Sequence, residues 1–315
     1  MKILIVGTGI VGVSHGFALS EAKLDITHLV RSNKIDTLTQ NGINLDIYDM
    51  RGVDPEQRTT IYYPKVIDTC NNNTFDWIIV PTKHYQLIDT LKQIYPLQKQ
   101  AKYLLFCANW DGLAEVNKIL PQSQYILGYS TCSGGYDDNN TMVLNIRSSY
   151  RIGDYDNTHA KLLQEAMDLF ATANFKPEIK KNMLEWLWVH HAINAGTIGA
   201  LLYAGGFSSL EDQKFADIFH QATIEALQVL AKRGVDIQTY PDTNMFLQRT
   251  PAEALEHYRK LFIETEVGRR VIRAGHYKYA PEEMHQYYLD VLQTGEKLGV
   301  NIPTLQLFKQ RLINS

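Results

Sequence analysis

The chain contains little cysteine, little net charge and no long apolar run. Its three cysteines, Cys70, Cys107 and Cys132, are too few and too far apart for a disulfide framework or a Cys-x-x-Cys metal or redox site. A formal net charge of −3 gives no reason to expect nucleic acid or an anionic membrane as partner. No apolar run reaches the roughly 18 residues of a membrane span, and the apolar start before Gly7 is too short for a signal-peptide core. We therefore expect a cytoplasmic protein without a nucleic-acid or membrane partner.

The bulk composition is that of an ordinary globular protein. Hydrophobic residues make up 45% of the chain and charged residues 21%, which excludes the disordered and fibrous classes. A length of 315 residues allows two hydrophobic cores or one large domain. Local patterns along the chain have to distinguish these two organisations.

The chain opens on a strand, a tight turn and a helix. Apolar residues run into Gly7-x-Gly9-x-x-Gly12, and small and apolar residues continue to residue 22. In dinucleotide-binding folds the first glycine permits the turn, the second lets a pyrophosphate approach the backbone, and the third lets helix and strand pack closely. Phosphates then bind the free N–H groups at the start of the helix. The predicted cofactor loop consists of Gly7, Thr8, Gly9, Ile10, Val11 and Gly12.

The end of the second predicted strand, residues 25–30, carries Arg31. An NAD site usually has an acidic residue here to bind the ribose 2′-hydroxyl, whereas the planar guanidinium of arginine suits a 2′-phosphate. We therefore predict NADP(H) as the cofactor. The alternative is that Arg31 and Lys34 are solvated loop charges.

Strands and helices then alternate along the chain. Residues 75–80 and 103–106 are buried-strand patterns, and helices are predicted at 86–95 and 113–120. This alternation is typical of a doubly wound parallel sheet, in which ligands bind beyond the carboxyl ends of the strands. The residues after these strands, 81–83 and 107–112, are therefore expected to meet the cofactor loop.

The pattern changes after residue 124. Residues 125–133 and 142–152 predict an antiparallel hairpin that extends the sheet, and a helix at 158–174 and a strand at 175–179 follow. Beyond residue 181 only helical periodicity remains. The predicted helices are 182–203, 212–233, 251–264 and 282–297, with a terminal turn after Pro303. We predict a Rossmann-type dinucleotide-binding domain at 1–181 and an all-α substrate and dimerisation domain at 182–315, with the substrate between them.

With these residues the chain resembles the ketopantoate reductase family, the NADPH-dependent 2-dehydropantoate 2-reductases of pantothenate synthesis, over nearly its whole length. The resemblance implies that Lys83 contacts cofactor or substrate, that Asn109 lies near the nicotinamide, and that Glu283, found by spacing from Pro303, is the glutamate of the substrate domain. It also implies a small carbonyl compound as substrate. A homodimer is kept open as the assembly.

One helix departs from the pattern of that family. Asn194, followed by Thr197, matches the last asparagine of the family's Lys-Leu-x-x-Asn-x-x-x-Asn motif, but Trp186 occupies the position of its catalytic lysine and His190 that of its first asparagine. The family's substrate serine has no match in residues 271–276. The resemblance therefore carries over fold and cofactor but not the identity of the substrate.

Another group has to do the work of the missing lysine. Hydride delivery to a carbonyl develops an alkoxide, which needs a proton donor or a cation. Helical spacing places Trp186, His190, Asn194 and Thr197 on one face. Histidine is suited to general acid catalysis near neutral pH, so His190 is the first candidate and Lys83 its competitor.

These candidates also have plainer explanations. His190 on a core-facing stripe beside Trp186 fits a packing residue, and Glu283 after Pro281 fits a carboxylate that complements a helix start, rather than one that binds a substrate hydroxyl or ammonium group. His191 faces another side of the helix and is a poorer candidate. The adjacent pair His190 and His191 lacks metal-ligand spacing, so no metal site is predicted.

Three functions follow from these residues. The first is an NADPH-dependent reductase of a 2-oxo acid or related small carbonyl compound. The second is an opine-type reductase of imines, which join an amino acid to a 2-oxo acid. The third is a sensor that binds NADP(H) without catalysis; the retained Lys83, Asn109 and Glu283 argue against it.

Overall fold

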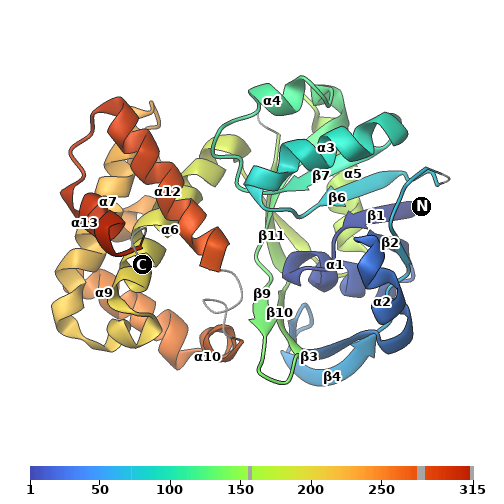
Figure 1. Ribbon diagram of the computed structural model, residues 1–315, viewed down its shortest axis with the longest axis horizontal. Coiled ribbons are helices and arrows are strands. Elements are labelled where there is room, and N and C mark those ends of the chain that lie inside the picture. Colours follow the sequence, from blue (N-terminus) through green and yellow to red (C-terminus); the bar gives the residue numbers. More distant parts are fainter. Residues whose placement is uncertain (72, 155–157, 275–280, 313–315) are drawn as a thin grey trace. The chain divides into compact units, whose positions relative to one another are not determined.

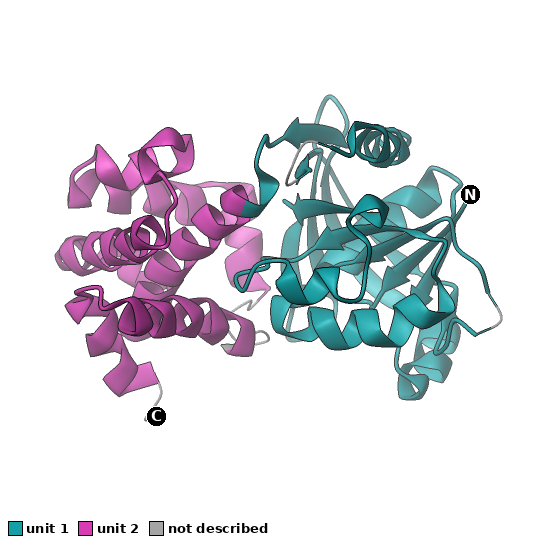
Figure 2. Ribbon diagram, turned by 90° about the horizontal axis from the view of Figure 1, so that it is seen from above, with its two compact units in different colours: residues 1–184 teal, residues 185–315 magenta. Residues whose placement is uncertain are grey.

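The computed structural model (Figure 1) describes residues 1–71, 73–154, 158–274 and 281–312. The chain forms two compact units, Met1–Leu184 and Glu185–Ser315, coloured separately in Figure 2. The sequence places the domain boundary between residues 181 and 182, close to this division. The roles assigned to the two domains stay predictions.

The first unit is built on an eight-stranded sheet with the order β12-β11-β8-β7-β6-β1-β2-β5. All neighbouring strands run parallel except β8 and β11. The strands are β1 (Lys2–Val6), β2 (Asp25–Leu29), β5 (Val66–Ile67), β6 (Trp77–Val80), β7 (Lys102–Phe106), β8 (Tyr125–Ser130), β11 (Ser149–Gly153) and β12 (Lys176–Ile179). The predicted α/β fold of Rossmann type is thereby confirmed.

A second sheet has four strands in the order β4-β3-β10-β9. They are β3 (Ile43–Met50), β4 (Glu56–Tyr62), β9 (Ser133–Tyr136) and β10 (Met142–Arg147). The prediction of one strand at 142–152 was wrong, because the chain leaves this sheet at Ser148 and continues as β11 in the large sheet. The apolar alternation runs through the break, and the parallel pairing of β10 with β3, far away in sequence, decides where each half lies.

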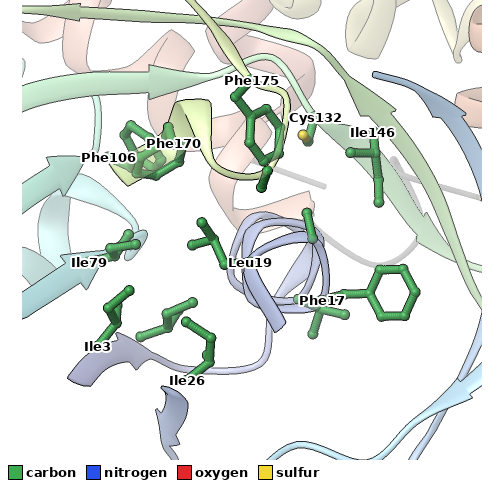
Figure 3. Close-up of a cluster of buried hydrophobic side chains, with 14 of the residues drawn as sticks. Ile3, Phe17, Leu19, Ile26, Ile79, Phe106, Cys132, Ile146, Phe170 and Phe175 are labelled. Carbon is green, nitrogen blue, oxygen red and sulfur yellow. The ribbon is translucent and has the colours of Figure 1, made fainter. Parts of the chain in front are cut away.

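Helix α1 (Ile10–Glu21) lies between the two sheets and contributes to one hydrophobic core with both (Figures 1 and 3). Figure 3 shows Phe17 and Leu19 on this helix, with Ile3 and Ile26 from the large sheet on one side and Ile146 from the small sheet on another. Because both sheets cover it, α1 is apolar around most of its circumference instead of along one stripe.

Shorter helices complete the first unit. They are α2 (Ile35–Asn41), α3 (Leu87–Ile94), α4 (Ala114–Asn117) and α5 (Ala160–Ala171). α5 adds Phe170 to the core around α1, whereas the buried Leu87 and Leu91 of α3 lie outside that core. In Figure 1, α3 and α1 lie on opposite sides of the large sheet, so both faces of its central strands are covered, as parallel sheets require.

The second unit consists of helices in its described residues. They are α6 (Met183–Ala204), α7 (Ala216–Lys232), α8 (Pro241–Leu247), α9 (Pro251–Arg259), α10 (Glu266–Arg273), α12 (Pro281–Leu298) and α13 (Pro303–Leu312), with a π-helical turn at Lys260–Glu264. The sequence missed α8 and α10 and predicted only a turn where α13 forms. No helix among the described residues is long and apolar enough to cross a membrane.

Two contacts of α7 explain how this unit holds together. A Cβ at Gly196 of α6 would lie 2.4 Å from the Cα of Thr223, so this glycine lets α6 and α7 approach backbone to backbone. The fully buried carboxylate of Glu225 accepts hydrogen bonds from the N–H groups of Thr304 (3.1 Å) and Leu305 (2.9 Å). It therefore satisfies the otherwise unpaired amides at the start of α13 and complements the positive end of that helix.

Candidate functional site

Four strand ends meet at one edge of the large sheet. β7, β6, β1 and β2 are neighbours and run parallel, and the segments after their carboxyl ends carry Asn109, Lys83, the glycine turn (residues 7–12) and Arg31, respectively. The strand order reverses between β1 and β6, and ligands bind in such sheets at the point of reversal. The structure thus brings together the predicted cofactor residues, all of which belong to the first unit.

The glycine turn has the geometry that its three glycines predict. Gly7 has φ +87°, a backbone conformation that L side chains rarely adopt. A Cβ at Gly12 would lie 2.9 Å from the carbonyl oxygen of Gly7, so only glycine allows this approach of helix to strand. A Cβ at Gly9 would meet no atom within 4 Å. The space beside Gly9 is therefore open to a ligand.

The start of α1 offers hydrogen-bond donors. The first bond of the helix runs from the N–H of Val13 to the carbonyl of Gly9 at 2.8 Å, so the N–H groups of Ile10, Val11 and Gly12 have no acceptor within the helix. Gly9 is the N-cap residue and provides no side-chain cap, and the first turn has no acidic residue. Such an uncapped helix start next to open space fits the pyrophosphate of a dinucleotide.

Arg31 follows β2 with extended backbone angles of φ −67° and ψ 145°. Its side chain is exposed, and it takes part in no ion pair within the part of the chain that the structure describes. An arginine held by no carboxylate keeps its planar donors available for an anion.

Lys83 and its neighbours follow β6. Lys83 is half-buried, and its Nζ lies 5.8 Å from the centroid of the Tyr85 ring. The preceding Thr82 has a buried hydroxyl oxygen without a hydrogen-bond partner among the described residues. Buried polar atoms rarely stay unpaired, so Thr82 marks a place for a ligand or water. The sequence analysis expects the segment 81–83 at this edge but does not single out Thr82, since threonine after a strand is common.

Asn109 follows β7 and is held tightly by its own loop. It has φ +48° and is only 5% exposed. Its Nδ2 donates to the carbonyl of Cys107 at 3.2 Å, and the Cys107 thiol donates to its Oδ1 at 3.7 Å. Burial raises the pKa of Cys107 to about 12, so the thiol keeps the proton that it donates. These contacts fix the orientation of the Asn109 amide.

His28 is a residue near the glycine turn that the sequence analysis missed. It lies in β2, is fully buried, and its Nδ1 is 2.9 Å from the carbonyl oxygen of Gly7. A lone histidine in the middle of the predicted strand 25–30 is the one signal that could have pointed to it, although this pattern also fits a packing residue.

In the second unit, α6 brings three predicted residues together. Trp186 and His190 stack with ring centroids 5.3 Å apart and an interplanar angle of 12°. The Trp186 indole N–H donates to Asp242 Oδ2 of α8 at 3.1 Å. Asn194, one turn after His190, places its Nδ2 3.0 Å from His190 Nε2. The predicted helical face thus exists for these three residues.

The bond from Asn194 decides where His190 carries its proton. An amide nitrogen donates, so Nε2 of a neutral His190 accepts and Nδ1 holds the hydrogen. His190 is half-buried, unlike the neighbouring His191, which is fully buried with its Nε2 3.1 Å from Asp290 Oδ2. His191 is therefore placed in the interior of the helical unit.

Thr197 and Glu283 take no part in the contacts of this group. Thr197 is 1% exposed and donates its hydroxyl to the carbonyl of Ile193 at 2.8 Å, so it supports the packing of α6. Glu283 lies half-buried in the first turn of α12. Of residues 271–276, in which the sequence has no match for the family's substrate serine, 275 and 276 lie outside the described residues. Among the described residues no three His, Cys, Asp or Glu side chains are grouped as metal ligands.

Comparison with known proteins tests the resemblance. Residues 3–157 match the family described as ketopantoate reductase PanE/ApbA. This part of the chain belongs to the ketopantoate reductase family. The match contains all the predicted cofactor residues of the chain, and α6 with Trp186 lies beyond it. The family is one of oxidoreductases.

Individual proteins extend the similarity over the whole chain. A 2-dehydropantoate 2-reductase from Pyrococcus abyssi (strain GE5 / Orsay) is 22% identical over 273 residues, 86% of either chain. A D-mandelate dehydrogenase solved with NADH and anilino(oxo)acetate has a TM-score of 0.74 at 14% identity, covering 100% of this chain and 98% of the other. A 2-dehydropantoate 2-reductase from Geobacter metallireducens GS-15 has a TM-score of 0.72 at 14% identity, covering 100% and 99%. At this identity the structures establish only the fold that the chain shares with them.

Proposed function

We propose that this protein is an NADPH-dependent reductase of a 2-oxo acid or a related small carbonyl compound, similar to 2-dehydropantoate 2-reductase. The observation that carries the proposal is the uncapped start of α1 beside the exposed Arg31 at one sheet edge. The relative from Pyrococcus abyssi bears the name of that reductase. The mandelate dehydrogenase structure, with NADH, concerns a 2-hydroxy acid, the reduced counterpart of a 2-oxo acid.

Residues of the first unit would bind and orient the cofactor. The glycine turn receives the pyrophosphate on the N–H groups of α1, and Arg31 binds the 2′-phosphate that distinguishes NADPH from NADH. Bound NADPH supplies a hydride to the carbonyl carbon of the substrate. Asn109, whose amide orientation is fixed by Cys107, orients the nicotinamide end.

The remaining candidates act on the substrate. As negative charge develops on the carbonyl oxygen, Lys83 polarises it and His190 donates a proton to it. The imidazolium form of His190 releases this proton and becomes a neutral ring, while the side-chain amide of Asn194 holds the ring at Nε2. Trp186 gives this end of the site an apolar wall, and Glu283 binds a substrate hydroxyl.

The test is a cofactor oxidation assay. The purified protein is titrated with NADPH and NADH, and absorbance of the reduced cofactor is then followed with ketopantoate and a panel of 2-oxo acids, each with and without added amines. We expect NADPH to bind more tightly than NADH and at least one 2-oxo acid to be reduced without an amine.

Other outcomes decide against the proposal. Turnover that requires an amine would favour the opine-type imine reductase. Binding of NADPH without oxidation by any member of the panel would favour the non-catalytic sensor. Failure to bind either dinucleotide would overturn the proposed function as a whole.

A further inference from the structure

The side chain of His28, in β2, packs against α1 at a position where the helix has a glycine. The imidazole is fully buried. A Cβ at Gly16 of α1 would lie 2.4 Å from His28 Nε2 and 2.7 Å from its Cε1. Any larger residue at position 16 would therefore displace the ring, and Gly16 and His28 form a matched pair.

The hydrogen bonds of His28 fix its tautomer. Its Nδ1 is 2.9 Å from the carbonyl oxygen of Gly7, which only accepts, so Nδ1 carries the hydrogen. Nε2 of the neutral ring must then accept, and its partner at 3.1 Å is the Tyr62 hydroxyl of β4. The Tyr62 oxygen lies 3.4 Å from the Ser20 hydroxyl. A chain of donors thus runs from β4 through His28 to the glycine turn.

Both backbone polar groups of Gly7, its N–H and its carbonyl, have defined neighbours in that turn. The N–H of Gly7 is fixed by the carbonyl of Leu29 at 2.8 Å, and its carbonyl lies next to Gly12, at the start of α1. His28 binds this carbonyl from the side of β2. Both polar groups of Gly7 are therefore held, although its φ of +87° lies outside strand geometry.

We propose that His28, oriented by Tyr62, is a positioning residue of the dinucleotide site, which holds the Gly7 carbonyl so that the amides of α1 keep the arrangement that receives the pyrophosphate. The inference rests on the proposed function. Its physical basis is preorganisation: a turn that is already ordered loses less entropy when the ligand binds.

The environment of His28 supports this role. Burial lowers its pKa to about 4, so the ring stays neutral and keeps its acceptor at Nε2 throughout the physiological range. Protonation would give Nε2 a hydrogen that faces the Tyr62 hydroxyl and would disturb the donor chain.

Three substitutions at position 28 separate the two bonds of the ring. His28→Leu removes both, His28→Asn places an amide nitrogen near the position of Nδ1, and His28→Gln reaches toward Tyr62 instead.

We expect the dissociation constant of NADPH, measured by fluorescence titration, to rise about tenfold in His28→Leu, which corresponds to one lost hydrogen bond of about 1.4 kcal/mol. His28→Asn should recover most of this loss, and His28→Gln should not. Tyr62→Phe, which removes one hydroxyl, should weaken binding about threefold.

His15 provides the matched control. It lies on α1, is 1% exposed, and bonds through Nε2 to the Ser130 hydroxyl at 2.8 Å without contacting Gly7. His15→Leu should destabilise the protein as His28→Leu does but leave the NADPH dissociation constant unchanged. Urea unfolding measures the stability, and amide hydrogen exchange of residues 7–12 measures the order of the turn, which should decrease only in the His28 series.

The outcomes are distinguishable. NADPH affinity and exchange of residues 7–12 that stay unchanged in His28→Leu would overturn the inference alone, as would equal affinity losses in His28→Leu and His15→Leu. Absence of dinucleotide binding by the unmodified protein would overturn the proposed function and the inference with it. Selective loss in His28→Leu with rescue by His28→Asn establishes the positioning role.

Discussion

The two candidate regions, the glycine turn and the face of α6 that carries Trp186, His190 and Asn194, differ in the groups that they offer to a ligand. The turn offers backbone N–H groups next to open space, and its three glycines matter because they carry no side chain. The face of α6 offers side chains: the stacked rings of Trp186 and His190, with the amide of Asn194 on the imidazole.

This difference explains why one region follows the family pattern and the other departs from it. A backbone site is determined by turn geometry, so few residues at fixed spacing produce it and few changes are tolerated. A side-chain site on a helix keeps its scaffold when the functional groups change, because the hydrogen bonds of the helix join backbone atoms and do not depend on the identity of those side chains. We therefore expect this chain to bind its cofactor as the family pattern implies, and to differ from that pattern in its substrate.

The largest effect is expected from Gly9→Asp. Gly9 has φ −74° and free space for a Cβ, and aspartate is a favourable N-cap residue, so folding should persist. Its carboxylate would repel the pyrophosphate, and we expect NADPH affinity to fall about 1000-fold, or about 4 kcal/mol. Fluorescence titration together with thermal unfolding checks this. An unchanged affinity would mean that the dinucleotide does not bind at the start of α1.

Acid should weaken the first unit through its buried histidines. Burial lowers the pKa of His28 to about 4 and that of His15 to about 3, below the ordinary value of 6.5. Between pH 6.5 and 4 the unfolded chain therefore binds more protons than the folded chain, and stability that is complete above pH 6.5 is lost as the pH falls.

Each of these histidines should lower the free energy of unfolding by about 3 kcal/mol when the pH falls from 7 to 4. The measurement is urea unfolding at both pH values for the unmodified protein and for His28→Asn, which should lose about 3 kcal/mol less. Equal losses in the two proteins would contradict the assignment to His28.

His190→Leu tests the side-chain region. If His190 donates the proton, kcat should fall about 100-fold, the lower end of what general acid catalysis contributes, while the NADPH dissociation constant stays the same. The measurement is steady-state kinetics with the best 2-oxo acid across a pH series. A full kcat in this variant would make Lys83 the sole group that stabilises the developing charge.

Arg31→Ala should have the smallest effect and act only on cofactor choice. Loss of a charge-assisted contact to the 2′-phosphate should weaken NADPH binding about 10- to 30-fold and leave NADH binding unchanged. Titration with both cofactors measures the ratio, and Lys34→Ala is the control for a nearby exposed cation. Equal weakening in both variants would assign Arg31 to general surface charge.

The helical unit shows which features a sequence pattern predicts and which it does not. The periodicity of residues 182–203 predicted α6 closely, because a long regular helix leaves a clear signal. It did not predict that the indole of Trp186 binds Asp242, which lies 56 residues later, since the pairing of helices α6 and α8 is set by packing. The same holds for the small sheet, in which β3 and β10 pair across almost a hundred residues.

The sequence by itself determined the glycine turn, the alternation of strands and helices along the first unit and the arginine that follows β2, because each follows from local backbone geometry and a short repeat of apolar residues. Only the tertiary structure decided that residues 142–152 divide between two sheets, that Thr197 turns inward, and that His28 reaches the Gly7 carbonyl. These features depend on contacts between residues distant in the chain, and a one-dimensional pattern carries no information about which of several equally apolar or polar partners lies across the interior.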